Sequence, residues 1–122
     1  MNLVDSCGWL EYFADGPSAP FFAPPIEQTE ILLVPTICLY EVFKRVLQQR
    51  DETLAIDAVA LMRQATVVEL TEPIALHAAR LSHDRKLPMA DSIILATALA
   101  GEANPLDPGF PLCQNKRRPL PR

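Results

Sequence analysis

Several features that mark common protein classes are missing from this chain of 122 residues. It has only two histidines and three cysteines, with no C-x-x-C pair, so neither a structural zinc site nor a disulfide framework is expected. No G-x-G-x-x-G, P-loop or G-x-S-x-G pattern is present, which argues against a nucleotide cofactor and a serine-hydrolase elbow. No apolar run approaches the roughly 18 residues of a membrane span.

The start of the chain carries no Lys or Arg before its first apolar residues, unlike a secretory signal. We therefore expect a cytoplasmic protein with no membrane partner. His77 and His83 have no partner at metal-ligand spacing, so we interpret both as structural or surface groups.

Charge is distributed unevenly along the chain. Residues 1–115 hold all 15 acidic residues and 7 of the 11 basic ones, a net charge of −8, whereas residues 116–122 carry +4. An acidic body argues against tight nonspecific binding of nucleic acid, because such binding relies on neutralising phosphates. It does not exclude a nuclease, since a bound cation reverses the local field.

Apolar runs alternate with helical patterns over most of the chain. Short runs without polar alternation suit parallel strands that are covered on both faces. The alternation predicts an α/β fold with a right-handed, parallel sheet between helices. Strands are predicted at 2–5, 31–34 and 66–70, and helices at 6–13, 36–49, 51–65, 71–85 and 88–100. Two Pro-rich segments, 16–20 and 24–25, are predicted to be irregular, and a short helical turn is possible around Phe21 and Phe22 between them.

The end of the chain has a different composition. Residues 104–122 contain five of the twelve prolines, and proline is a poor member of a central strand. We predict a main domain over residues 1–101 and an irregular, Pro-rich basic tail over residues 102–122.

Three acidic residues stand where this fold can bring them together. Asp5 ends the first predicted strand, Glu41 lies in the helix after the second, and Asp91 follows Pro88 at the start of the last helix. Open α/β sheets place working groups beyond the carboxyl ends of their strands, and a cluster of acids there favours a divalent cation. Each acid also has a plainer interpretation: Asp5 as a helix cap, Glu41 as a solvated side chain, Asp91 as a helix-dipole partner. Ser6 either caps its helix or hydrogen-bonds near the metal.

Three segments resemble motifs of PIN-domain ribonucleases, especially the VapC-like toxins of toxin–antitoxin pairs. They are residues 4–13 (VDSCGWLEYF), 35–42 (PTICLYEV) and 87–98 (LPMADSIILATA), and the resemblance extends over roughly residues 1–101. The family continues with a Thr-x-Asp-x-Asp-Phe segment and further strands. Here Pro105 and Gly109 replace the Thr and the second Asp, while Asp107 and Phe110 keep their spacing.

The resemblance implies a three-layer α/β/α domain with a short parallel sheet, whose C-terminal strands are missing or altered. It implies Mg²⁺ or Mn²⁺ as cofactor, with Asp5 as the central ligand, Glu41 and Asp91 as direct or water-bridged ligands, and Asp107 as a fourth acid in doubt. It also implies an RNA substrate, a homodimer and a VapB-like antitoxin. That partner would place a helix in a groove formed by the first helix, the Phe21–Phe22 region and the Glu41 helix, and an Arg against the acids.

The function predicted from the sequence is therefore a metal-dependent endoribonuclease, the toxin of such a pair. The alternative is a catalytically impaired PIN-like module that keeps antitoxin binding, which the altered C-terminal segment motivates. A third possibility is a hydrolase that acts on DNA or on phosphate monoesters, since acids and a metal do not identify the sugar.

Overall fold

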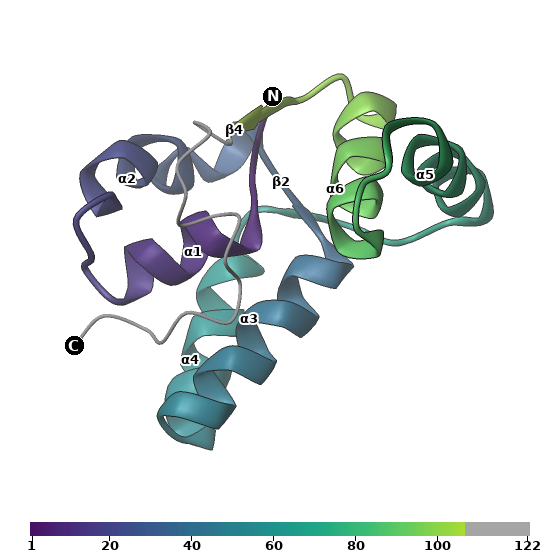
Figure 1. Cartoon of the computed structure of the whole chain (residues 1–122). Helices are drawn as coiled ribbons and strands as arrows, with labels where there is room; N and C mark the ends of the chain where they lie inside the picture. Colours follow the sequence, from purple (N-terminus) through teal and green to yellow (C-terminus); the bar gives the residue numbers. More distant parts are fainter. Residues whose placement is uncertain (107–122) are drawn as a thin grey trace.

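A computed structural model describes residues 1–106 of the chain (Figure 1). Its centre is a four-stranded sheet in the order β3-β2-β1-β4, in which every neighbouring pair is parallel. The central strand β1 places Leu3 opposite Leu33 on one side and Pro105 on the other. The strands are β1 (Asn2–Val4), β2 (Leu32–Pro35), β3 (Thr66–Val68) and β4 (Asn104–Leu106).

The helices cover both faces of this sheet. Figure 1 shows α1 and α2 on one side, α5 and α6 on the other, and the α3–α4 pair extending beyond the end of β2. The predicted α/β/α architecture with a short parallel sheet is thereby confirmed. The helices are α1 (Ser6–Phe13), α2 (Ala19–Glu27), α3 (Thr36–Gln49), α4 (Glu52–Met62), α5 (Glu72–Arg85) and α6 (Met89–Ala100), with a 3₁₀ turn at Thr29–Ile31.

Two helices begin at the side-chain caps that the sequence predicted. Asp51 accepts a hydrogen bond from the Leu54 amide at 2.8 Å, and Thr71 accepts one from the Ile74 amide at 3.4 Å. These side chains satisfy amides that have no partner within the first helical turn. The starts of α4 and α5 are therefore set locally.

The segment around Pro24 and Pro25 is helical, so the prediction of an irregular stretch there is wrong. Both prolines lie inside α2, where their missing amides cost two helical hydrogen bonds. Burial offsets this cost, because Phe22 and Ile26 lie one turn apart and both face the core. The neighbouring helix α1 approaches closely at Gly8, where an added Cβ would come within 2.8 Å of the Phe22 ring.

Residues 104–106 form the strand β4, although the sequence predicted an irregular tail from residue 102 onward, so that prediction is wrong for these three residues. Proline is tolerated at the edge of a sheet, because an edge strand need not use every amide. Pro105 occupies such a position in the described part of the chain, where β4 has β1 as its neighbour. Residues 107–122, including Asp107, lie outside the described residues, so the division at residue 101 stays a prediction.

Apolar side chains form two buried clusters. The main one surrounds the sheet and includes residues of α1, α2, α3, α4 and α6. A smaller one joins α5 to α6 through Ile74, Ala78, Leu81, Ile93 and Ala96. Cys38 is a buried free thiol in the main cluster, and Cys7 on α1 is partly buried against the same cluster. In residues 1–106 no helix has the length and apolarity needed to cross a membrane.

Candidate active site

Asp5 lies at the carboxyl end of β1 and is the N-cap residue of α1. Its backbone carbonyl accepts hydrogen bonds from the amides of Gly8 at 2.9 Å and Trp9 at 3.2 Å. Its side chain makes no capping hydrogen bond, although one carboxylate oxygen, Oδ1, is buried. The interpretation of Asp5 as a plain helix cap therefore does not account for its carboxylate.

Ser6 joins the first acidic motif to the second. Its hydroxyl donates a 2.6 Å hydrogen bond to Oε1 of Glu41, a residue 35 positions away in the chain, and Ser6 is only 2% exposed. A bond to a carboxylate is stronger than one between neutral groups. Of the two roles predicted for Ser6, the structure has the hydrogen bond to an acid and not the helix cap. Glu41 consequently lies beside the residue that follows Asp5.

Glu41 is half-buried on the second turn of α3, next to the fully buried Val42. It is held by another element of the fold, so it is not a freely solvated side chain. Because β1 and β2 are adjacent and parallel, their carboxyl ends meet at one edge of the sheet. Asp5 and Glu41 both belong to this edge.

Asp91 lies in the first turn of α6, where the helix dipole favours a negative charge. The nearby Ile93 packs in the smaller cluster with Ile37, the second residue of α3, and with Val68, the last residue of β3. The start of α6 therefore lies at the same end of the strands as the start of α3, as Figure 1 also shows. All three predicted acids belong to this end of the sheet.

The donors present are the oxygens of carboxylates and hydroxyls, the type that Mg²⁺ and Mn²⁺ prefer. Nevertheless, over residues 1–106 no group of three or more His, Cys, Asp or Glu side chains is arranged so that it could hold a metal ion. The structure thus connects Ser6 to Glu41 directly and brings Asp5 and Asp91 to the same end. It does not close the three carboxylates into one coordination site.

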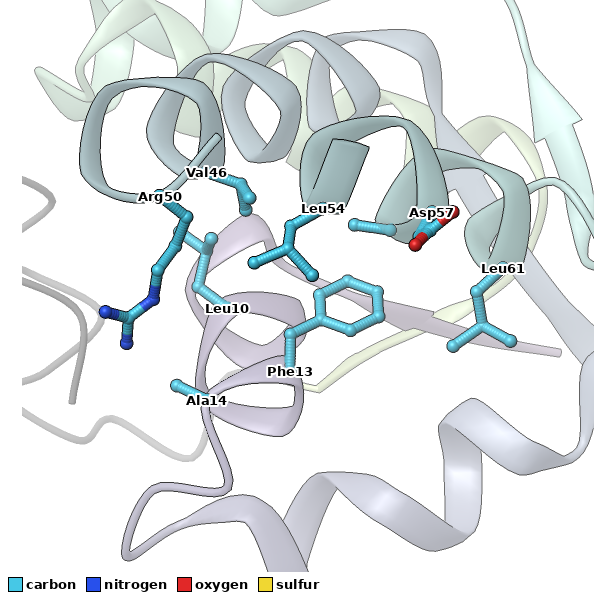
Figure 2. A pocket seen from close by; sticks show the side chains of 9 residues that line it. Leu10, Phe13, Ala14, Val46, Arg50, Leu54, Asp57 and Leu61 are labelled. Carbon is cyan, nitrogen blue, oxygen red and sulfur yellow. The ribbon is translucent and has the colours of Figure 1, made fainter. Parts of the chain in front are cut away.

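An apolar groove of about 340 Å³ opens between α1, α3 and α4 (Figure 2). Leu10 and Phe13 form one wall, and Leu54 and Leu61 of α4 form the opposite one, with Arg50 near one end. The predicted groove used α1 and α3 as well, but included Phe21 and Phe22. Neither ring is among the residues that line this groove: Phe22 is buried in the core, and Phe21 is exposed on α2.

Sequence reasoning missed the contribution of α4 to this groove. A signal was present, because α4 carries leucine or isoleucine on more than one face. Leu54, Ile56 and Leu61 are each more than a third exposed. A helix with apolar residues on several faces often packs against other elements or proteins on more than one of those faces.

Comparison with known proteins agrees with this architecture. A chain in the solved structure of a toxin–antitoxin complex from Klebsiella pneumoniae superposes with a TM-score of 0.73, at 19% sequence identity, covering 92% of this chain and 94% of that one. At this identity the similarity concerns the fold alone. No curated protein matches the sequence. The family model described as PIN domain matches residues 3–104, which includes all three acids, and the chain belongs to the PIN domain family.

Proposed function

We propose that this protein is a metal-dependent endoribonuclease that serves as the toxin of a toxin–antitoxin pair. The observation that carries the proposal is the 2.6 Å hydrogen bond from Ser6 to Glu41, which joins two acidic motifs of a PIN domain at the carboxyl edge of the sheet. The similarity to a chain of a toxin–antitoxin complex supports the biological context. A cytoplasmic location fits this function.

The residues that would hold Mg²⁺ or Mn²⁺ are Asp5 as the central ligand, with Glu41 and Asp91 binding directly or through water. The ion supplies an activated water and shields the charge on the phosphate oxygens. The hydroxyl of Ser6 fixes one oxygen of Glu41, so the other oxygen keeps a defined direction. The side chain of Asp5 does not cap α1, which fits a role other than capping for this carboxylate.

A cleavage assay tests this proposal. We expect wild-type protein with Mn²⁺ to cut single-stranded RNA and the Asp5→Asn variant, purified in parallel, to cut it at least about a hundredfold more slowly, the scale on which one key catalytic group acts. Matched DNA and a phosphate monoester identify the substrate class. Equal RNA breakdown by both proteins would point to a contaminating nuclease and would reject the proposal.

A second candidate is a PIN module that binds its antitoxin but does not cleave. Two observations favour it: no metal-binding group of three acids forms over residues 1–106, and Pro105 stands where the family motif has a Thr. A folded protein that binds its antitoxin, gains no stability from Mn²⁺ and does not cleave RNA would support this module over the nuclease.

The partner that we propose is a VapB-like antitoxin, which would place a helix in the groove between α1, α3 and α4. Leu10, Phe13 and Leu54 offer the apolar surface that such a helix buries, and an Arg of the partner would approach the acids. Leu54→Asp would weaken this complex without touching the acids. We also propose a homodimer, to be checked by light scattering of the purified chain.

A further inference from the structure

The C-terminal end of α5 carries three basic side chains. Arg80, Arg85 and Lys86 lie within a stretch of seven residues, and all three are exposed. Within residues 1–106, none of the three forms an ion pair or a side-chain hydrogen bond. The acid among them, Asp84, contacts His83 at 3.1 Å. This cluster therefore presents a net positive charge to solvent.

Most other basic residues of the described chain have partners. Lys44 lies over the ring of Tyr40 and hydrogen-bonds its hydroxyl at 3.5 Å, and Arg45 and Arg50 also interact with neighbouring groups. Only Arg63, at the end of α4, resembles the α5 cluster in being exposed without such a partner in residues 1–106. Because residues 1–115 carry a net charge of −8, the cluster stands out as a local positive site.

A short turn places this cluster next to the start of α6. Lys86 ends α5 in a left-handed conformation with φ 54°, and the hydroxyl of Ser82 donates a 2.7 Å hydrogen bond to the carbonyl of Leu87. Leu81 of α5 and Ile93 of α6 pack in the same buried cluster. Asp91 follows Lys86 by five residues, so the cations and this acid share one end of the α5–α6 pair.

We propose that Arg80, Arg85 and Lys86 bind phosphates of a single-stranded RNA and position it beside the acids. This inference rests on the proposed nuclease function. Carboxylates repel a polyanion, and a metal ion offsets that repulsion only locally. Cations a short distance along the strand would hold the flanking phosphates, as lysine and arginine do in nucleic-acid interfaces generally. They are positioning residues, since none lies among the proposed ligands.

A purely structural role for these residues makes a different prediction. Basic side chains at a helix C-terminus interact favourably with the helix dipole. On that account their removal would lower the melting temperature and leave RNA affinity unchanged. An acidic segment of a protein partner is the other candidate ligand, and the position beside Asp91 favours RNA over it.

The test measures binding of a fluorescein-labelled single-stranded RNA of mixed sequence by anisotropy, with Mg²⁺ and over a range of KCl concentrations. All proteins carry Asp5→Asn so that RNA is not consumed. The test variant combines Arg80→Gln, Arg85→Gln and Lys86→Gly, because glycine keeps the positive φ at residue 86. The matched pair is Arg85→Gln against Arg63→Gln, since Arg63 precedes β3 and belongs to the opposite end of the sheet.

We expect the triple variant to bind RNA about tenfold more weakly at low salt, and its slope of log affinity against log salt to be flatter by about 2. Arg85→Gln should show part of this loss and Arg63→Gln none, with melting temperatures recorded for every variant. An unchanged slope in the triple variant would overturn the proposal. So would an equal loss in Arg63→Gln, or competition by polyglutamate as effective as that by unlabelled RNA of equal charge. Failure of the nuclease proposal would appear elsewhere, as equal cleavage by wild type and Asp5→Asn, and would leave these binding results in place.

Discussion

The dipeptide Asp-Ser occurs at the start of α1 and again at the start of α6, and the two copies are held differently. Ser6 and Ser92 are each 2% exposed, and each donates one short hydrogen bond. Ser6 bonds to the carboxylate of Glu41 on another helix, at 2.6 Å, whereas Ser92 bonds to the carbonyl of Met89 in its own helix, at 2.7 Å. The serine of the first pair is thus tied to a distant motif, whereas the hydroxyl of the second bonds within its own helix.

The position of Asp91 depends on how α6 packs, because Asp91 lies in the first turn of that helix. Two consecutive residues of α6 show this dependence, because Ile93 belongs to the small cluster shared with α5 and Ile94 belongs to the main core. The residues of the proposed site therefore belong to two packing units, the main core and the smaller α5–α6 cluster. One contributes Asp5 and Glu41 through the main core, and the other sets the α6 end that carries Asp91.

Alanine substitutions at these two isoleucines would separate the packing units. We expect Ile94→Ala to lower the free energy of unfolding by about 3–4 kcal/mol and Ile93→Ala by about 2–3 kcal/mol, because Ile94 is the more deeply buried. Urea unfolding measures both values. Amide exchange should show that Ile93→Ala loosens mainly α5 and α6, as expected for local opening. Uniform loss of protection across the sheet in Ile93→Ala would contradict the two-unit description.

A metal titration tests whether both Asp-Ser pairs serve one ion. At a Mn²⁺ concentration about 100 times Kd, binding to the native state should add about 2.7 kcal/mol of stability, visible as a higher melting temperature. Asp5→Asn and Asp91→Asn should each lose most of this gain, while Ser92→Ala should keep it. A folded wild-type protein whose melting temperature does not respond to millimolar Mn²⁺ would count against the site.

The same substitution at the two serines compares their hydrogen bonds directly. Ser6→Ala removes a donor to a carboxylate, so we expect it to cost about 1–2 kcal/mol of stability and to weaken the Mn²⁺ response. Ser92→Ala removes only a bond to its own helix and should cost about 0.5 kcal/mol or less. Urea unfolding with and without Mn²⁺ provides both measurements. Similar costs for the two serines would mean that the bond to Glu41 has no special role.

Local signals in the sequence predicted much of this arrangement. Asp51 and Thr71 are helix caps whose action extends only three residues, so the starts of α4 and α5 could be inferred from them. The placement of Asp5 and Glu41 followed from the rule that parallel strands end at one edge. These inferences needed little knowledge of which elements pack together.

Features that depend on packing partners were not predictable in the same way. Pro24 and Pro25 indicate a helix break, yet burial of Phe22 and Ile26 maintains α2 through them. Pro105 argues against a strand until its place at the edge of the described sheet is known. A phosphate-binding role for the cations at the end of α5 could be proposed only once the structure showed that they lie near the start of α6 and have no partners in the described chain. In each case the deciding information is which element lies alongside.

The far end of α1 offers the smallest effect, in a region away from both serines. The hydroxyl of Tyr12 donates a 3.4 Å hydrogen bond to Oε2 of Glu27 on α2, and burial, followed by the charge and hydrogen bond of Glu27, raises the pKa of Tyr12 above its ordinary value of 10.0. Between these pKa values the folded protein keeps a proton that the unfolded chain has lost. Its stability must then fall as the pH rises above about 10.

Tyr12→Phe removes this linkage while keeping the ring of the side chain. We expect little change in the urea midpoint at pH 7, because the hydrogen bond is long and exposed. Above about pH 10 the midpoint of the variant should decline less steeply than that of wild type. If the two proteins lose stability in parallel, Tyr12 does not couple α1 to α2 through Glu27. The polar links that seat α1 would then be the Ser6–Glu41 bond and the 2.8 Å bond from the Ser18 amide to Glu11.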